Sequence, residues 1–337
     1  MSEGTSYIPG FDVMKFIMAI IVVEIHTLGL HQLPCFLLNS IVRPLEDISV
    51  PLFFVFSSYL FFLKVRKMEF QAALINFERY ERRICMLYLL WCIVNMFLVY
   101  KHKTYIQNIE WQTPLLFIKD FLTGYIYPSS WFFGALMVSV FIVFFVSRLM
   151  SDRIIWFIPF TIGVYTLYAK ELSPPYDFFY NLYSDWFRDP NLSFPRALFY
   201  VSLGHLASNK HVMNAYSNIG VKTGFVFLLG ALILWQVEPY SGIFMGVLGL
   251  FSISFSWELP HEKKTIFVRL RTYSIWFYCM HMLLLQIYKM IVGHFNLVVL
   301  DYNIFSFLFV LISLFVLSTI LYKAKEYRYF SWLKYSF

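Results

Sequence analysis

FIMAIIVVEIHTLGL (Phe16–Leu30) is an almost unbroken apolar stretch that nevertheless carries two titratable side chains, Glu24 and His26. At about 1.5 Å per residue it provides most of the length that a helix needs to cross a bilayer. A carboxylate or an imidazole inside hydrocarbon has to be paired, hydrated or used in chemistry. The stretch therefore predicts a membrane helix with two side chains that require a physical explanation.

The composition of the whole chain predicts an integral membrane protein. Hydrophobic residues make up 59% of the 337 residues and charged residues only 14%, whereas soluble domains contain about 25% charged residues. The first apolar stretch follows Asp12 and Lys15 and lacks a small-residue cleavage site, so we expect it to remain as a membrane helix. The four cysteines show no paired spacing, so neither a disulfide framework nor a metal site is expected.

Apolar runs close to the length of a bilayer crossing recur along the chain. We expect an all-α integral membrane protein with about ten transmembrane helices, in a single domain over 1–337 without a fused soluble domain. The candidate spans are 12–30, 48–63, 84–100, 131–149, 154–169, 195–208, 218–235, 240–257, 273–293 and 304–322. No internal repeat is evident in the sequence.

The distribution of basic residues predicts an orientation. Most of the 27 Lys and Arg residues fall on one side of these spans if the N-terminus is cytoplasmic, which is where loop cations accumulate. Both termini are then cytoplasmic, and the +7 net charge reflects basic loops rather than a nucleic-acid partner. The long outer segments 101–130 and 170–194 are rich in aromatic and acidic residues, a composition that suits either interfacial packing or sugar binding.

Helical geometry separates the two polar residues of the first span. His26 lies fourteen residues after Asp12, which is about 21 Å and almost four turns, so Asp12, Lys15 and His26 share a face and His26 lies in the outer half of the membrane. Asp12 and Lys15 can pair at i,i+3. Glu24 lies on another face, and we expect a structural carboxylate bonded to Tyr, Trp or Arg of a neighbouring helix. His26 itself suits either packing or chemistry.

Two further histidines lie within predicted spans. In YSIWFYCMHMLLLQIY, Ser274, Tyr278 and His281 recur at i, i+4 and i+7. They form one polar face, which in a membrane helix usually turns towards protein or water. His205 lies near the inner end of a short span, where an interfacial position is the more economical interpretation.

Arg79, Arg82 and Arg83 form a basic cluster where the third span is expected to begin, on the cytoplasmic side. Neighbouring guanidinium groups can hold phosphate through bidentate, charge-assisted hydrogen bonds. The same cluster can also serve as a topology anchor that binds anionic lipid headgroups. Charge alone leaves both interpretations open.

Taken together and in order, these segments resemble the acyltransferase 3 family of bacterial membrane-bound acyltransferases. The matching features are FDVMKFIMAIIVVEIHT with Asp12, Lys15 and His26; VPLFFVFSSYLFF; Arg79-x-x-Arg82; SSWFFGALMV around Trp131; RALFYVSLGHLAS; and Ser274-x3-Tyr278-x2-His281. They extend from residue 11 to residue 281. The chain has Ser57-Ser58 where the family usually has Ser-Gly, and Glu24 where the family is normally apolar.

The resemblance implies transfer of an acyl group, usually acetyl, from coenzyme A to a hydroxyl of a glycan or lipid-linked saccharide at the bacterial inner membrane. Arg79 and Arg82, together with Arg83, would hold the phosphates of acetyl-CoA or another acyl-CoA. His26 would act as general base, with Ser57, Tyr278 and His281 as candidate donors to the oxyanion. Asp12 and Lys15 would form a structural pair. The acceptor, the oligomeric state and the choice between direct transfer and an acyl-His intermediate are left open.

A transporter or exporter of a small polar or anionic compound is the alternative from another functional class. About ten membrane helices with intramembrane His and Glu residues would suit such a carrier. Carriers, however, often show inverted repeats and matching broken helices in their two halves. The sequence shows neither feature, so an enzyme is the preferred hypothesis.

Overall fold

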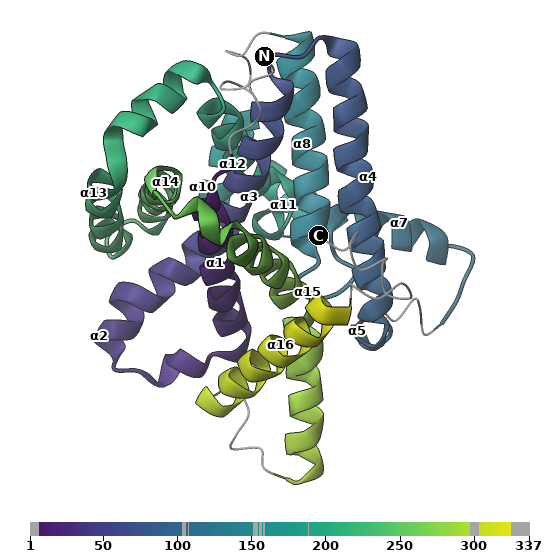
Figure 1. Ribbon diagram of the computed structural model, residues 1–337. Helices are drawn as coiled ribbons and strands as arrows, with labels where there is room; N and C mark the ends of the chain where they lie inside the picture. Colours follow the sequence, from purple (N-terminus) through teal and green to yellow (C-terminus); the bar gives the residue numbers. More distant parts are fainter. Residues whose placement is uncertain are drawn as a thin grey trace. The chain divides into compact units, whose positions relative to one another are not determined.

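The computed structural model describes residues 7–102, 106, 108–150, 154, 157, 159–187, 189–296 and 303–324, and every regular element in this part is helical (Figure 1). The elements are α1 (Pro9–Thr27), η1 (Gly29–Gln32), α2 (Cys35–Leu37), η2 (Leu38–Val42), α3 (Arg43–Val65), α4 (Phe70–Val94), α5 (Met96–His102), α7 (Thr113–Thr123), α8 (Trp131–Leu149), α10 (Pro159–Tyr168), η3 (Ala169–Glu171), α11 (Phe178–Trp186), η4 (Pro190–Leu192), α12 (Phe194–Ala207), α13 (Lys210–Trp235), α14 (Pro239–Ser256), η5 (His261–Lys263), α15 (Lys264–His294) and α16 (Ile304–Ala324). The predicted all-α fold class is therefore confirmed for the described residues.

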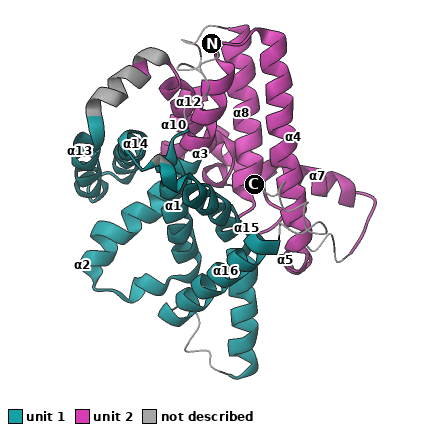
Figure 2. Ribbon diagram, viewed as in Figure 1, with its two compact units in different colours: residues 1–53, 214–337 teal, residues 54–213 magenta. Residues whose placement is uncertain are grey.

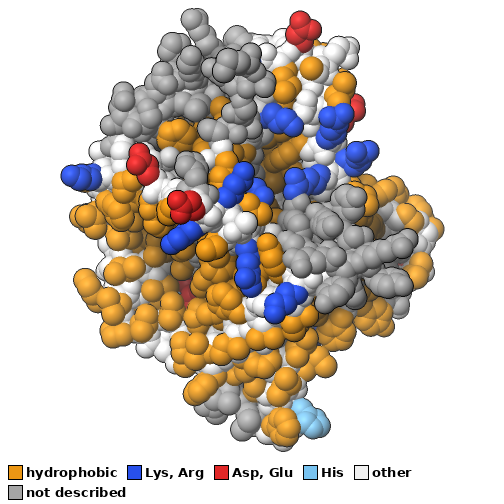
Figure 3. Space-filling model, in the orientation of Figure 1, with side chains coloured by type: hydrophobic (Ala, Val, Ile, Leu, Met, Phe, Trp, Pro, Cys, Tyr) orange, Lys and Arg blue, Asp and Glu red, His pale blue; other side chains and the backbone are white. Residues whose placement is uncertain are grey.

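Each of the predicted spans overlaps at least one helix. Within the described residues, five helical stretches are long and apolar enough to cross a membrane: Cys35–Val65, Trp131–Leu149, Pro239–Ser256, Lys264–His294 and Ile304–Ala324. Wide hydrophobic areas also cover the face of the molecule in Figure 3, as expected for a surface in contact with lipid. The protein is a multi-pass helical membrane protein.

Several helix boundaries differ from the sequence-based expectation. The third predicted span lies in a helix that begins much earlier, at Phe70, and α5 follows it after a break at Asn95. Helix α13 begins at Lys210 and is interrupted at Gly220, whose φ of 69° only glycine adopts without strain. Of the span 154–169, the described helix is α10; residues 155, 156 and 158 lie outside the described residues.

The chain forms two compact units (Figure 2). Unit 1 comprises residues 1–53 and 214–337, and unit 2 comprises residues 54–213. Unit 1 thus joins the two ends of the chain, whereas unit 2 is built from its middle. Helix α3 contributes its first half to unit 1 and its second half to unit 2, because the boundary falls between Phe53 and Phe54.

In unit 1, helix α1 packs against α14, α15 and α16. The ring of Phe16 lies 5.3 Å from that of Phe277 on α15 and 5.9 Å from that of Phe315 on α16. At the start of α1, Gly10 allows the backbone to approach the carbonyl oxygen of Ser254 at the end of α14, because a methyl group there would overlap this oxygen. These contacts fix α1 from its first turn onward.

In unit 2, helix α8 packs against α4, α7 and α12, and α12 also packs against α10. Phe77 of α4 stacks on Phe144 of α8 with ring centroids 4.5 Å apart. Gly204 of α12 leaves room for the hydroxyl of Ser58, which donates to the carbonyl oxygen of Phe54 at 2.7 Å. The Ser58 that departs from the usual Ser-Gly pattern is therefore accommodated by a glycine on the facing helix.

We predict that Gly10→Ala destabilises the protein, because the new methyl group would overlap the backbone of α14. Overpacking of this kind costs about 1–3 kcal/mol, and thermal unfolding in detergent measures the loss. Gly293→Ala is the matched control, since a methyl group at Gly293 meets no atom within 4 Å. Equal melting temperatures for the two variants would contradict the predicted close approach of α1 and α14.

Candidate active site

Two histidines from different helices meet in unit 1. His26 of α1 and His281 of α15 have ring centroids 4.9 Å apart, with planes inclined by 32°. His26 is half-buried, whereas His281 is only 1% exposed. Helices α1 and α15 pack along much of their length, and this packing brings together two residues that the sequence suggested separately.

The hydrogen bond of His281 defines the tautomer of its neutral ring. Its Nδ1 lies 3.0 Å from the carbonyl oxygen of Phe277, and because a carbonyl oxygen can only accept, Nδ1 carries the proton. Nε2 then presents a lone pair, and it is buried without a hydrogen-bond partner among the described residues. A neutral His281 therefore offers an acceptor here; donation from Nε2 to an oxyanion would need a second proton on the ring.

The polar face of α15 is buried inside the protein, as its periodicity predicted. Tyr278 has its ring centroid 6.0 Å from that of His281 and 6.2 Å from that of Phe53. The Ser274 hydroxyl donates to the carbonyl oxygen of Arg271 at 2.7 Å, so it is engaged within its own helix. On this face, it is therefore the ring of Tyr278 that packs beside His281.

Asp12 is held by groups beyond those that helical spacing suggested. The hydroxyl of Tyr7 donates to its Oδ2 at 2.7 Å, and the cations that act on its carboxylate are Arg271 and Lys15. Tyr7 precedes α1 and Arg271 lies on α15, so neither contact appears in an i,i+3 pattern. Asp12 is buried at the start of α1 and links this helix to α15.

The predicted partner of Glu24 is wrong. Its Oε1 accepts the backbone N–H of Leu30 at 2.6 Å instead of bonding to Tyr, Trp or Arg on a neighbouring helix. Leu28 ends α1 in the left-handed conformation, with a φ of 53°, and the chain turns back into η1. The carboxylate therefore caps this 3₁₀ turn, whose free N–H groups favour an anion.

Arg79, Arg82 and Arg83 lie together on the exposed side of α4 in unit 2. The expectation that they stand at the start of a helix is wrong, because α4 begins at Phe70. Its first turns are amphipathic and bury Ala73 and Phe77, so the helix extends well before the apolar run. The cluster projects from the middle of a packed helix, which holds the three guanidinium groups close together.

Ser57 lies half-buried on the unit 2 part of α3.

A half-buried acid, Glu81, interrupts this basic cluster. Desolvation by burial raises the pKa of Glu81 to about 8, because the charged form is disfavoured away from water. At neutral pH Glu81 is therefore mostly protonated and does not cancel the charge of the arginines around it. Its Oε1 is buried without a hydrogen-bond partner in the described part of the chain.

Two other arginines of unit 2, Arg66 and Arg148, bind backbone carbonyl groups at helix ends. Arg66 donates to the carbonyl oxygen of His205 at 3.0 Å and to the hydroxyl of Ser208 at 3.1 Å, while Arg148 donates to the carbonyl oxygens of Val65 and Met68. Both therefore cap helix C-termini, where cations are favourable. His205, in the last turn of α12, is buried and meets the ring of Phe62 edge-on at 4.7 Å.

The aromatic segment 170–194 forms one wall of an apolar cavity of about 760 Å³ in unit 2. Helix α11 contributes Phe179, Tyr183 and Trp186, and α10 contributes Tyr165 from the opposite side. The lining is almost entirely apolar, so the aromatic residues of this segment shape a hydrophobic hollow rather than a polar, sugar-binding surface.

Apolar helices that carry a pair of neighbouring histidines, together with an exposed arginine cluster, define a multi-pass membrane protein with a candidate site for group transfer. A family model described as an acyltransferase domain matches residues 8–323, which include parts of both units. The chain belongs to the acyltransferase 3 family and is a membrane acyltransferase. Searches of curated proteins and of solved structures give no significant match.

We predict that Glu81 makes the stability of the protein fall as the pH rises from about 4.5 to about 8. The folded pKa of about 8 lies above the ordinary value of 4.5, so the folded state binds the proton more tightly and loses this advantage in that window. Glu81→Gln removes the titration, so its melting temperature relative to wild type should rise between pH 5 and pH 8. Exposed Glu78→Gln is the control; the same trend in that variant would refute the assignment.

Proposed function

We propose that the protein is an O-acyltransferase that moves an acyl group, most simply acetyl, from cytoplasmic acyl-CoA to a hydroxyl of a glycan or lipid-linked saccharide. The setting would be a bacterial inner membrane, with about ten spans and both termini in the cytoplasm. Membership of the acyltransferase 3 family supports the reaction class and favours an enzyme over a carrier. The observation that carries the proposal is the contact of His26 with His281.

The reaction needs a base near the acceptor and donors near the thioester carbonyl. In the proposal, His26 removes the proton of the acceptor hydroxyl, whose oxygen attacks the carbonyl carbon as its oxygen becomes an oxyanion. The new C–O bond forms, the C–S bond breaks, and the coenzyme A thiolate leaves and takes the proton. Tyr278 is a candidate oxyanion donor on the same helix face as His281, and Ser57 stays a candidate from the sequence alone. Transfer through an acyl-His intermediate involves the same groups.

His281 has a supporting role in this scheme. Its Nε2 lone pair is fixed by the bond from Nδ1 to the Phe277 carbonyl oxygen. This lone pair is a hydrogen-bond acceptor beside the ring of His26. It would stabilise the protonated form of His26 that exists once the base has removed the hydroxyl proton. The half-buried position of His26 leaves that ring, rather than the buried ring of His281, as the one that substrate reaches.

The donor would bind through its phosphates. Arg79, Arg82 and Arg83 are exposed on one helix, and guanidinium groups bind phosphate oxygens through charge-assisted hydrogen bonds. A protonated Glu81 keeps the charge of this cluster high near neutral pH. For the acceptor, the apolar cavity beside α11 is suited to a lipid chain, which supports a lipid-linked saccharide.

We predict that His26→Ala lowers acyl transfer about 10²–10⁴-fold, the usual contribution of a general base, with donor affinity unchanged. The assay is transfer of label from acetyl-CoA to candidate lipid-linked saccharides by the purified protein in detergent or vesicles. His294→Ala, at the far end of α15, is the control. Full transfer by His26→Ala would remove His26 as the base, and the absence of thioester consumption by wild type would refute the proposed function.

We predict that Arg82→Ala weakens binding of acyl-CoA about tenfold or more, because a hydrogen bond to a charged group is worth about 1.5–3 kcal/mol. Arg79→Ala should behave in the same way, and calorimetry with acetyl-CoA or desulfo-CoA measures the affinity. Lys64→Ala removes an exposed cation at the end of α3 and is the matched control. Unchanged affinity in both arginine variants would make the cluster a topology anchor.

A further inference from the structure

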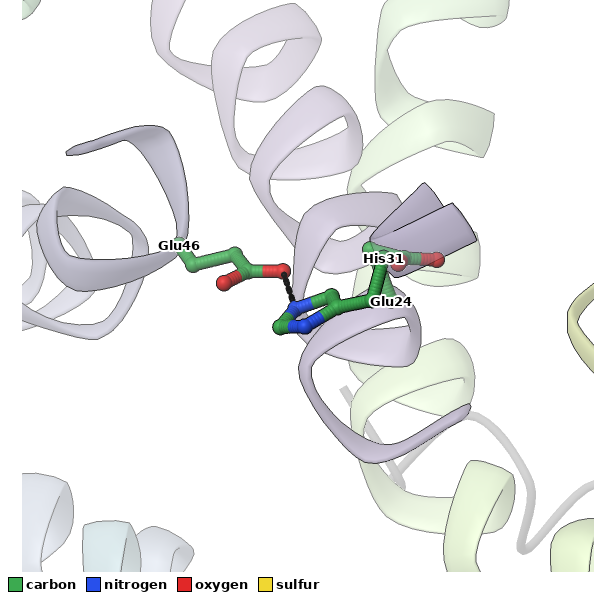
Figure 4. A group of neighbouring side chains, drawn as sticks. All are labelled: Glu24, His31 and Glu46. Atoms are coloured by element: carbon green, nitrogen blue, oxygen red, sulfur yellow. Dashed lines mark hydrogen bonds and ion pairs between the residues drawn. The ribbon is translucent and has the colours of Figure 1, made fainter. Parts of the chain in front are cut away.

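Three side chains of unit 1 converge at the end of α1 (Figure 4). They are Glu24 of α1, His31 of η1 and Glu46 of α3. Their ligand atoms all lie within 4.8 Å of one another, and His31 Nε2 is 3.2 Å from Glu46 Oε1. The side chains of His31 and Glu46 are 27% and 12% exposed, so water reaches this cluster from one side.

Glu24 is the unusual member of the cluster. It is completely buried, with a relative exposure of 0%. Its Oε1 accepts the Leu30 N–H, but its Oε2 has no hydrogen-bond partner among the described residues. A buried carboxylate oxygen without a donor is costly, and Glu46 adds a second carboxylate whose charge acts on it. Oε2 of Glu24 therefore lacks a positive partner.

The surrounding charges do not supply that partner. His31 and Arg43 are the cations that act on Glu46, whereas the charge that acts on Glu24 is the carboxylate of Glu46. Asp47, the other acidic neighbour, accepts a hydrogen bond from Trp235 Nε1 at 2.9 Å. A bound cation would give Glu24 Oε2 the partner that the described residues do not provide.

We propose that Glu24, His31 and Glu46 form a binding site for a zinc-like divalent cation. Ligands about 2.0–2.2 Å from zinc stand about 3.4 Å apart in a tetrahedron, and the His31–Glu46 pair already has nearly this separation. Glu24 completes a set of one imidazole and two carboxylates, and the exposed side leaves a position for water. Imidazole favours zinc and related metals, whereas calcium and magnesium prefer sites made of oxygen alone.

Metal binding would exchange one hydrogen bond for three coordinate bonds. Nε2 of His31 must offer its lone pair, so the neutral ring carries its proton on Nδ1 and no longer donates to Glu46. The cation would then connect the end of α1, the turn η1 and the start of α3. Because Glu24 is only two residues from His26, this connection would also stabilise the segment that carries the proposed base.

The sequence predicted no metal site, because no spacing marked these residues. They are separated by seven and fifteen positions and lie on three elements. His31 and Glu46 also lie outside the predicted spans, and nothing in the sequence related them to Glu24.

We predict that the purified, tag-free and chelator-stripped protein binds one zinc ion per chain, counted by atomic emission after gel filtration. Thermal unfolding should shift upward by about 3–5 °C at free zinc near one hundred times its dissociation constant, with a much smaller shift in magnesium or calcium. Glu24→Gln and Glu46→Gln should lose both the bound zinc and the shift, while His294→Gln keeps them.

Glu24→Gln retains an oxygen for the Leu30 N–H, so the isosteric change tests the charge and not the cap. If that variant does not elute as wild type does, Glu46→Gln and His31→Gln decide the outcome, because both residues are partly exposed. Absence of zinc from wild type, or zinc bound equally by Glu24→Gln and Glu46→Gln, overturns the proposal. Neither readout depends on acyl transfer, so failure here leaves the proposed function to its own test.

Discussion

The contact between α1 and α15 is the interaction on which the rest of the candidate site depends. A polar group in an apolar helix is tolerated only where a neighbouring helix satisfies or shields it, and this contact does so along α1. Phe16 packs on Phe277, Asp12 lies under the charge of Arg271, and His26 meets His281. Apolar packing between α1 and α15 therefore fixes the level along the two helices at which the histidines meet.

Charge in unit 2 is organised by burial. The exposed arginines of α4 keep their charge available because the acid among them, Glu81, is neutral near pH 7. The two other arginines, Arg66 and Arg148, are committed to helix ends. Basic residues that look alike in sequence thus divide into an exposed group on α4 and a partly buried pair that holds α3 and α12.

The sequence predicted the features that depend on periodicity. It did not predict helix starts and side-chain partners that depend on contacts between distant segments. The polar face of α15 and the helical character of every span follow from spacing of three to four residues. The early start of α4 was missed because Ala73 and Phe77 become a buried face only when α8 is present. The hydrogen bond from Arg66 to the carbonyl oxygen of His205 was missed because a separation of 139 positions carries no signal.

The sequence by itself determined the class of protein, because 59% hydrophobic residues in membrane-length runs leave a helical membrane fold as the economical solution. Its ordered motifs also determined the family. Only the tertiary structure decided which polar residues are partners. Glu24 caps the turn that follows its own helix and lies beside His31 and Glu46, because the left-handed Leu28 reverses the chain there. Helical spacing describes neighbours on one helix and contains no information about such a reversal.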